Sequence, residues 1–289
     1  MNQVSLTMDG VEFHLKEDHD FSWITNYGEV FKVFDQQDSG NICFGVKKAG
    51  KKFFIKYAGA NTLKFSDDIE EAIRKLKESV PIYETLKHSS LVRLIDSGEI
   101  GQGYALIFEW FEGEGLYPQG EFAKTEKYTH PDSPFYRFKQ LPVSERIKVM
   151  SEIIQFHVHV EEKGYVAIDF YDGSLMYDFQ QEQLKICDID YYQQKPFINH
   201  LGRLWGSSRF MSPEEFQLGS EIDGRTNVYN IGAMAFCLLG GELDRSFVKW
   251  EASKSLFEVM KKAVEKDRQN RFESLKQLAD KWEAVLHHD

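Results

Sequence analysis

Long hydrophobic runs and closely spaced cysteines are both missing from this sequence of 289 residues. No apolar run reaches the roughly 18 residues that a membrane-spanning helix needs. The opening residues MNQVSLTMDG lack the basic start and apolar core of a secretion signal. Cys43, Cys187 and Cys237 lie far apart and form no CxxC pair, which suits a reducing compartment. We therefore expect a cytoplasmic protein without a membrane partner.

Positive charge is also scarce. The chain has 35 Lys and Arg residues against 46 Asp and Glu residues, a formal net charge of −11. Such a charge repels polyanions, so nucleic acid is not an expected partner. The composition is otherwise that of a folded globular protein, with 42% hydrophobic and 14% aromatic residues. The sequence shows neither an internal repeat nor a low-complexity segment.

Two patterns of apolar residues, one typical of strands and one typical of helices, follow one another along the chain. The first part has short apolar runs bounded by Gly, Asn or Asp, and one stretch, 67–87, with apolar residues three and four apart. From Ser144, which we expect to cap a helix that ends at Gly164, the chain reads as mainly helical. This order predicts an α+β fold with a β-rich N-terminal lobe, one helix in it, and a helical C-terminal lobe. The expected strands are 10–15, 29–34, 41–46, 51–57, 91–100 and 104–111, and the expected later helices are 227–239, 255–265 and 273–287.

The segment 117–140 fits neither pattern, because it mixes aromatic residues, Pro and charged residues without periodicity. Loops of this length are usually functional or poorly ordered. Two interpretations stay open here: a variable surface insertion, or a segment that docks a substrate or partner.

Several charged residues directly follow apolar runs. Lys56 ends the run KKFFIK, and a lysine buried there needs an anionic partner, for which Glu78 in the predicted helix is available. Asp169 follows GYVAI and Asp188 follows LKIC, and a carboxylate in such a place is costly to bury without a cation or donor. The spacing predicts a β-hairpin that brings both aspartates to one cleft, with Asp172 and Asp190 nearby. Turn-capping aspartates are the alternative explanation from the residues alone.

In their order and spacing, six segments resemble eukaryotic-like Ser/Thr protein kinases, of the kind that bacteria also carry. FFIK resembles the Val-Ala-Ile-Lys strand, GYVAIDFYDGSLM the catalytic loop, and KICDID the Asp-Phe-Gly region. LKHSSLVRLIDSG resembles the segment after the regulatory helix, and YALIFEWFEGEGL the hinge that holds adenine. GSSRFMSPEEF, which resembles the Gly-Thr…Ala-Pro-Glu end of the activation segment, is the most specific of the six.

The resemblance implies a single protein-kinase-like domain over residues 1–289 that binds ATP with Mg²⁺ or Mn²⁺. Its N-lobe would cover about 1–111, its hinge and insertion about 109–140, and its C-lobe about 141–289, with the ATP site between the lobes. Lys56 would contact the phosphates, Asp188 would hold the metal, and Asp169 would orient the acceptor hydroxyl and accept its proton. The resemblance also assigns Glu78 as the partner of Lys56, Ser174 and Asp190 as further metal ligands, Glu109 and Phe111 as backbone contacts of adenine, Gly40 and Ile42 as cofactor-binding positions, and a structural pair of Glu214 with Arg271.

The sequence departs from the family pattern at most of these motifs. The glycine-rich loop keeps only Gly40, and Phe54 replaces the alanine that makes room for adenine. Because two of the loop glycines are replaced, close approach of the loop backbone to phosphate is in doubt. The other departures are Asp35 and Gln37 for the first two loop glycines, Ile168 for the Arg before Asp169, Tyr171 for the catalytic-loop Lys, Ser174 for the Asn that ligates metal, and Asn227 for an Asp that braces the catalytic loop.

Three functions remain open at this point. The first is a divergent Ser/Thr protein kinase that transfers the γ-phosphate of ATP to a protein hydroxyl, which the retained Lys56, Asp169 and Asp188 favour. The second is a pseudokinase that serves as a binding or allosteric scaffold. The third is a small-molecule kinase of the aminoglycoside type, which the Ser-Pro-Glu ending disfavours. The expected partner is a protein, as substrate or as binding partner, and the sequence gives no oligomeric state.

Overall fold

The computed structural model describes residues 3–117 and 125–288 and divides into two compact units. Unit 1 comprises the chain up to Lys87 together with Val92–Glu112. Unit 2 comprises His88–Leu91 and the chain from Gly113 onward. In the part of the chain that the structure describes, no helix is both long and apolar enough to cross a membrane.

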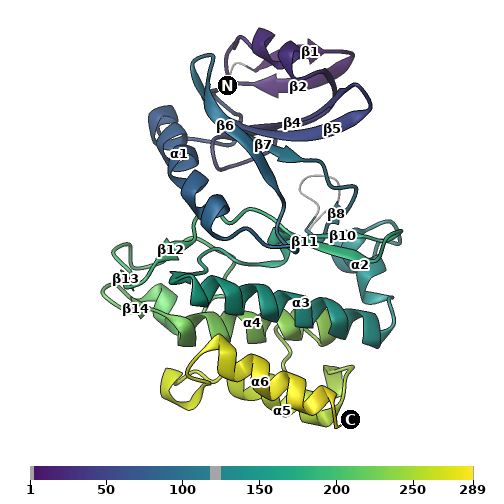
Figure 1. The fold of residues 1–289 in the computed structure, drawn as a ribbon, viewed down its shortest axis with the longest axis vertical. Helices are drawn as coiled ribbons and strands as arrows, with labels where there is room; N and C mark the ends of the chain where they lie inside the picture. The colour runs from purple at the N-terminus through teal and green to yellow at the C-terminus, as the bar shows by residue number, and fades with distance from the viewer. Residues whose placement is uncertain (1–2, 118–124, 289) are drawn as a thin grey trace. The chain divides into compact units, whose positions relative to one another are not determined.

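Unit 1 is built on a five-stranded antiparallel sheet with the strand order β3-β4-β5-β7-β6 (Figure 1). A separate antiparallel hairpin, β1–β2, precedes the sheet, and the helix α1 packs against β5 and β7. The strands are β1 Val4–Met8, β2 Val11–Leu15, β3 Glu29–Phe34, β4 Asn41–Lys48, β5 Lys51–Ala58, β6 Leu94–Ile100 and β7 Gly103–Glu109; α1 is Ile69–Thr85, and a short 3-10 helix is Ser22–Asn26.

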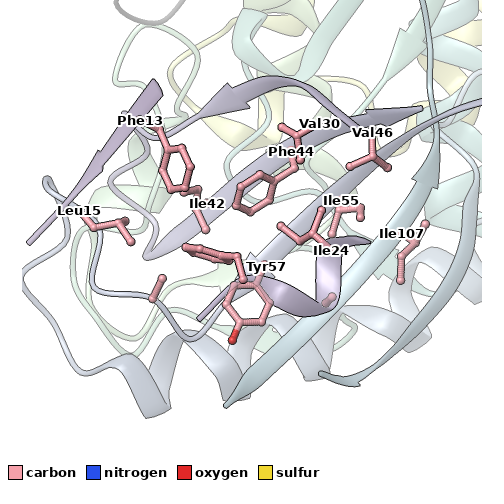
Figure 2. Close-up of a cluster of buried hydrophobic side chains, with 13 residues drawn as sticks. Phe13, Leu15, Ile24, Val30, Ile42, Phe44, Val46, Ile55, Tyr57 and Ile107 are labelled. Atoms are coloured by element: carbon pink, nitrogen blue, oxygen red, sulfur yellow. The ribbon is translucent and has the colours of Figure 1, made fainter. Parts of the chain in front are cut away.

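One face of this sheet forms the hydrophobic core of unit 1 (Figure 2). Alternate residues of β4 and β5, including Ile42, Phe44 and Tyr57, point into the core, where the β1–β2 hairpin adds Phe13. Because side chains alternate along a strand, the intervening residues, Lys56 among them, face the other side of the sheet.

Unit 2 is mainly helical. The long helix α3 (Val143–Glu162) packs against α4 (Gly224–Leu239) and α6 (Leu275–Leu286), and α5 (Lys254–Ala263) packs against α4 and α6 (Figure 1). α3 begins after Pro142, so the predicted cap at Ser144 is wrong by two residues, whereas Gly164 follows the helix end in the left-handed conformation, with a φ of 79°. The remaining elements are α2 Pro134–Lys139; strands β8 Glu114–Gly115, β9 Tyr165–Val166, β10 Leu175–Asp178, β11 Gln183–Ile186, β12 Gln193–Gln194, β13 Phe197–Ile198 and β14 Glu221–Ile222; and 3-10 turns Glu126–Tyr128, Asp172–Ser174, Pro213–Phe216, Phe247–Lys249 and Arg268–Asn270.

The segment from Thr125 to Lys139 packs closely within unit 2. The Ser133 hydroxyl caps α2 and donates to the carbonyl of Lys127, and Phe135 and Phe138 are buried. Residues 125–139 are therefore packed into unit 2, and residues 118–124 lie outside the described part. The choice between a surface insertion and a docking segment stays open. The order of elements, β-rich with one helix and then mainly helical, confirms the predicted α+β class.

Candidate active site

Asp169 and Asp188 share an unusual backbone conformation. Their φ angles are 62° and 57°, in the left-handed region that non-glycine residues seldom occupy. Six described non-glycine residues have a positive φ, and these two aspartates are among them. Of the other four, three lie in the tight turns of β-hairpins and the fourth is Glu242. Such conformations cost about 1–3 kcal/mol and persist where the surroundings impose them, often at functional sites.

Ser174 connects the loop of Asp169 to the strand that precedes Asp188. Its hydroxyl donates to the backbone carbonyl of Asp169 at 3.5 Å, and its own carbonyl accepts the N–H of Cys187 at 2.9 Å. The antiparallel strands β10 and β11 lie between the two aspartates, which confirms the predicted hairpin. The structure therefore brings the Asp169 loop, Ser174 and the start of the Asp188 segment together.

Two further contacts fix the chain on either side of Asp169. The side-chain amide of Asn227 accepts from the N–H of Ala167 and donates to its carbonyl, both at 2.8 Å. Asn227 therefore braces the chain just before Asp169, although it replaces the Asp of the family pattern. In addition, a Cβ added to Gly206 would lie 3.5 Å from the Cα of Asp169, so the segment around Gly206 passes directly beside Asp169.

The donors near Asp188 suit a hard divalent cation. Asp188 is exposed, and together with Ser174 it offers only oxygen atoms, which Mg²⁺ and Mn²⁺ prefer. Asp190, the other predicted ligand, is half-buried two residues further on. Within residues 3–117 and 125–288, no cluster of three or more His, Cys, Asp or Glu side chains could hold a metal by itself. A bound cation would therefore need phosphate oxygens or water to complete its coordination.

Tyr171, which replaces the catalytic-loop lysine, is a neutral group beside these carboxylates. Burial, followed by the charges of Asp188 and Asp169, raises the pKa of its phenol, so the hydroxyl keeps its proton. Its ring lies against Gly173, where a Cβ would come within 2.3 Å of a ring atom. Gly173 thus makes room for the ring, and Tyr171 can donate a hydrogen bond but cannot supply the positive charge of a lysine.

Asp172 is the centre of a buried ion cluster that the sequence did not predict. The carboxylate is fully buried and receives a bidentate contact from Arg209, with N–O distances of 2.8 and 3.0 Å. It also forms an ion pair with Lys127. Arg209 continues to Glu242 at 2.6 Å, which accepts a further bond from the Tyr128 hydroxyl at 3.0 Å. The cluster joins the loop that carries Asp169 and Asp172 to three segments that are distant in sequence, so no local pattern could reveal it.

The ammonium of Lys127 is enclosed by aromatic rings as well as by its carboxylate. It lies 4.1 Å from the ring centroid of Phe135, 4.9 Å from that of Tyr128 and 5.1 Å from that of Tyr117. Ring faces attract a cation and replace part of its lost hydration. Lys127 therefore fixes its segment against the loop that carries Asp169.

In unit 1, Lys56 lies on the sheet face opposite the core, and that face is rich in aromatic rings. Phe54 shares the face, with its ring 5.8 Å from Phe34 and 6.3 Å from Phe108. Phe108 is itself buried against Tyr83 of α1. The predicted orientation of Phe54 toward the side of Lys56 is thus confirmed.

Ile42 does not share that face. It is paired with Tyr57 across β4 and β5 and lies in the hydrophobic core (Figure 2). Cys43, by contrast, is paired with Lys56. The assignment of Ile42 as a cofactor-binding residue is therefore wrong by one position, and Cys43 has the orientation expected of it. A shift of one residue moves every side chain of a strand to the opposite face.

Gly40 has a packing role in the structure. Its φ is 79°, and a Cβ there would come within 2.9 Å of Ala72 in α1 and of the Phe65 ring. The close approach of the helix therefore explains this glycine without a phosphate. Asp35, at the position of the first loop glycine, accepts the N–H of His14 at 2.8 Å and so serves the β-hairpin.

Glu78 points away from the buried face of α1. Its side chain is 59% exposed and pairs with Arg74 at 2.5 Å. The next residue, Ser79, is on the buried face of α1. Successive side chains of a helix are about 100° apart around its axis, so Glu78 points in a different direction from Ser79. The predicted pairing of Glu78 with Lys56 is therefore contradicted, and Glu78 belongs to a surface ion pair.

The hinge residues lie at and beyond the end of β7. Glu109 is its last residue; its N–H donates to the carbonyl of Arg93, and its exposed carboxylate pairs with the Arg93 side chain at 2.9 Å. Phe111 is half-buried two residues further on. Contacts of either residue with adenine stay a prediction.

The end of the activation segment is fixed by a buried ion pair. Arg271 donates to both carboxylate oxygens of Glu214, at 2.6 and 3.1 Å, and Thr226 donates to the same carboxylate at 3.0 Å. Both charged partners are buried. The predicted structural pair of Glu214 and Arg271 is thereby confirmed.

Comparison with characterised proteins gives distant matches of one kind. The chain is 21% identical over 235 residues to the serine/threonine-protein kinase pkn2 of Myxococcus xanthus, covering 71% of this chain and 26% of that protein. It is 23% identical over 175 residues to PrkC of Bacillus subtilis, covering 60% and 24%. It is 21% identical over 164 residues to PknB of Mycobacterium leprae, covering 54% and 24%. The chain spans about a quarter of the length of these relatives. No protein-family model matches it.

Proposed function

Because this chain is a distant homologue of bacterial Ser/Thr protein kinases and belongs to the protein kinase superfamily, we propose that it transfers phosphate from ATP to a protein hydroxyl. The acceptor in this proposal is a serine or threonine. Since the chain spans only part of each relative, the substrates of those longer proteins are not carried over.

The proposal gives each retained residue one role. Lys56 binds the phosphates of the nucleotide, while Asp188, with Ser174 and Asp190, holds the divalent cation. Bound Mg²⁺ or Mn²⁺ would offset the negative charge that the phosphates carry. Asp169 orients the acceptor hydroxyl and takes its proton. Tyr171 stays protonated beside both aspartates and so offers a neutral hydrogen-bond donor where the family pattern has a cation.

The observation that carries the proposal is the strained backbone of Asp169 and Asp188. Both residues are held in the left-handed region, on two segments joined through Ser174, and Asn227 braces the segment of Asp169. A surface aspartate that only caps a turn needs no such bracing. Strain that persists in this way is typical of residues whose side chains must be aimed at a reacting group.

Two substitutions test the proposal with radiolabelled ATP and Mn²⁺ or Mg²⁺. Asp188→Ala should abolish phosphate transfer to a generic protein acceptor and weaken nucleotide binding, because a metal ligand is lost. Asp169→Asn should abolish transfer but leave nucleotide binding nearly unchanged. Asp132→Asn, at a side chain that is 86% exposed, is the matched control and should behave like the wild type.

A pseudokinase is the second candidate, and the ring-lined face of β5 favours it. Phe54, Phe34 and Phe108 occupy space on the side of the sheet that Lys56 shares, which leaves less room for adenine. Transfer by the wild type that does not exceed that of Asp169→Asn would support this candidate and contradict the first.

A further inference from the structure

Arg203 stands out in the activation segment because its charge is not neutralised by a carboxylate. One guanidinium nitrogen donates to the carbonyl of Leu204 at 3.1 Å and another to that of Gly206 at 2.9 Å. Among the residues that the structure describes, Arg203 forms no ion pair. Arg209 and Arg271, by contrast, form ion pairs with buried carboxylates.

The two carbonyl contacts hold Arg203 close to the proposed catalytic base. Gly206 passes beside Asp169, with only 3.5 Å between the position of an added Cβ and the Cα of Asp169. The side chain of Arg203 is therefore fixed one contact away from the residue that would meet the acceptor hydroxyl. A peptide whose serine or threonine meets Asp169 would therefore pass close to Arg203.

Three large apolar side chains close to Arg203 are exposed to solvent: Phe216, which its guanidinium faces, and Leu201 and Trp205, each two residues away in the sequence. Leu201 is 54% exposed, Trp205 40% and Phe216 42%. The guanidinium of Arg203 lies 5.8 Å from the Phe216 ring centroid, and the Trp205 ring packs at a tilt against Tyr191, with 5.0 Å between the ring centroids. We call Leu201, Arg203, Trp205 and Phe216 the activation-segment patch. Exposed apolar groups around one charged donor are typical of a surface that binds another chain.

We propose that the activation-segment patch selects protein substrates that carry an acidic residue among apolar residues, close to the phosphorylated serine or threonine. The proposal rests on the kinase function proposed above. An arginine already oriented by two carbonyls keeps its remaining N–H groups for a carboxylate, and its planar fork suits that partner. The apolar members of the patch accept the neighbouring side chains of the substrate.

The negative charge of the whole chain does not remove this preference. With a net charge of −11 the protein repels acidic segments at long range. At physiological ionic strength, however, charges more than about 8 Å apart are largely screened. The local cation therefore decides the preference once the peptide is in contact with the patch.

The test uses the whole chain, treated with phosphatase, and two fluorescein-labelled peptides of equal length. In the first, a central serine is flanked by leucine and aspartate; in the second, lysine replaces each aspartate. Fluorescence anisotropy should show tighter binding of the acidic peptide. Arg203→Glu should weaken that binding by about fivefold or more, as expected for an exposed charge pair turned into repulsion. Arg203→Lys should retain part of the affinity, because the charge stays but the fork is lost.

Arg93→Glu is the control for net charge. It changes the charge of the chain by the same two units as Arg203→Glu, at an arginine that is 69% exposed in unit 1. This variant should bind the acidic peptide like the wild type. Equal binding of both peptides, or an unchanged affinity in Arg203→Glu, would overturn the inference.

Phosphate transfer to the two peptides separates this inference from the proposed function. Preferential transfer to the acidic peptide supports both. Equal transfer to both peptides retains the kinase function and overturns the selectivity. Preferential binding of the acidic peptide without any transfer contradicts the kinase function but retains the patch as a surface that docks acidic segments.

Discussion

Phe54 and Lys56 lie two residues apart on β5, so their side chains face the same side of the sheet. The Phe54 ring is only partly buried and packs at a tilt against Phe34 and Phe108. A ring in this place reduces the room for a nucleotide base next to the lysine.

We therefore predict that Phe54→Ala tightens ATP binding, measured by calorimetry with Mg²⁺ and with Mn²⁺. Phe53→Ala, at the neighbouring position that packs on the other face, is the control and should not tighten it. Weaker binding in Phe54→Ala would mean that the ring stacks on the base instead of crowding it.

The residue that the sequence assigned to the wrong face, Ile42, shows what a single strand can reveal. Phe54 and Lys56 belong to one strand, and period-two alternation alone relates them correctly. The orientation of Ile42 relative to Lys56 depends instead on how β4 pairs with β5, and that register places Cys43 opposite Lys56. Because the preceding loop lacks regularly spaced glycines, this register could not be predicted from the sequence.

At the scale of elements, the end of the activation segment is connected to the helices of unit 2 by charge as well as by packing. Arg271 contacts Glu214 through two nitrogens and also donates to the carbonyls of Glu265, Lys266 and Arg225. Since both partners are buried, neither charge can be hydrated when the other is removed.

We predict that Arg271→Ala lowers the free energy of unfolding by about 3–5 kcal/mol, because it leaves the carboxylate of Glu214 buried without its cation. The measurement is chemical denaturation followed by circular dichroism. Lys276→Ala, which breaks an exposed pair with Asp280, is the control and should cost less than about 1 kcal/mol. A similar small change in Arg271→Ala would show that the pair is solvated in solution.

The elements that sequence patterns predicted are those with long, regular periodicity, such as α1, α3 and the strands of the five-stranded sheet. The short helix α2 was missed because six residues give less than two turns of pattern. The signal that could have found it is the Ser133-Pro134 pair, a capping hydroxyl followed by a first-turn proline.

At the scale of the whole molecule, stability depends on pH through groups that are buried far from solvent. Burial raises the pKa of Glu215 from its usual value near 4.5 to about 7, although Ser212 and Asn230 donate hydrogen bonds to it. As pH rises from about 4.5 to about 7, the unfolded chain loses this proton first, so the folded state loses relative stability.

We predict that Glu215→Gln removes this loss. The variant should gain up to about 3 kcal/mol of unfolding free energy relative to the wild type between pH 4.5 and pH 7, since each pKa unit corresponds to about 1.4 kcal/mol. Denaturation curves across that range measure the gain. Glu221→Gln, at an exposed glutamate of β14, should follow the wild type, and a constant difference between Glu215→Gln and the wild type would contradict the assignment.

The ion cluster around Asp172 also belongs to the whole molecule, because Lys127, Arg209 and Glu242 come from three different segments. Asp169, Ser174 and Asp188 could be predicted as site residues because they lie in segments that resemble known motifs. Motifs could not predict the role of Lys127, because its partner Asp172 is 45 residues further along the chain. Only the folded arrangement relates them.

The enclosure of Lys127 has a consequence for its chemical reactivity. An amine reacts with an acylating reagent only after it has lost its proton and reached solvent, and Lys127 is 3% exposed, with its ammonium paired to a buried carboxylate. Acetic anhydride should therefore modify exposed lysines such as Lys148 quickly and Lys127 slowly. The rate at which Lys127 becomes acetylated would then report how often residues 125–139 detach from the catalytic loop.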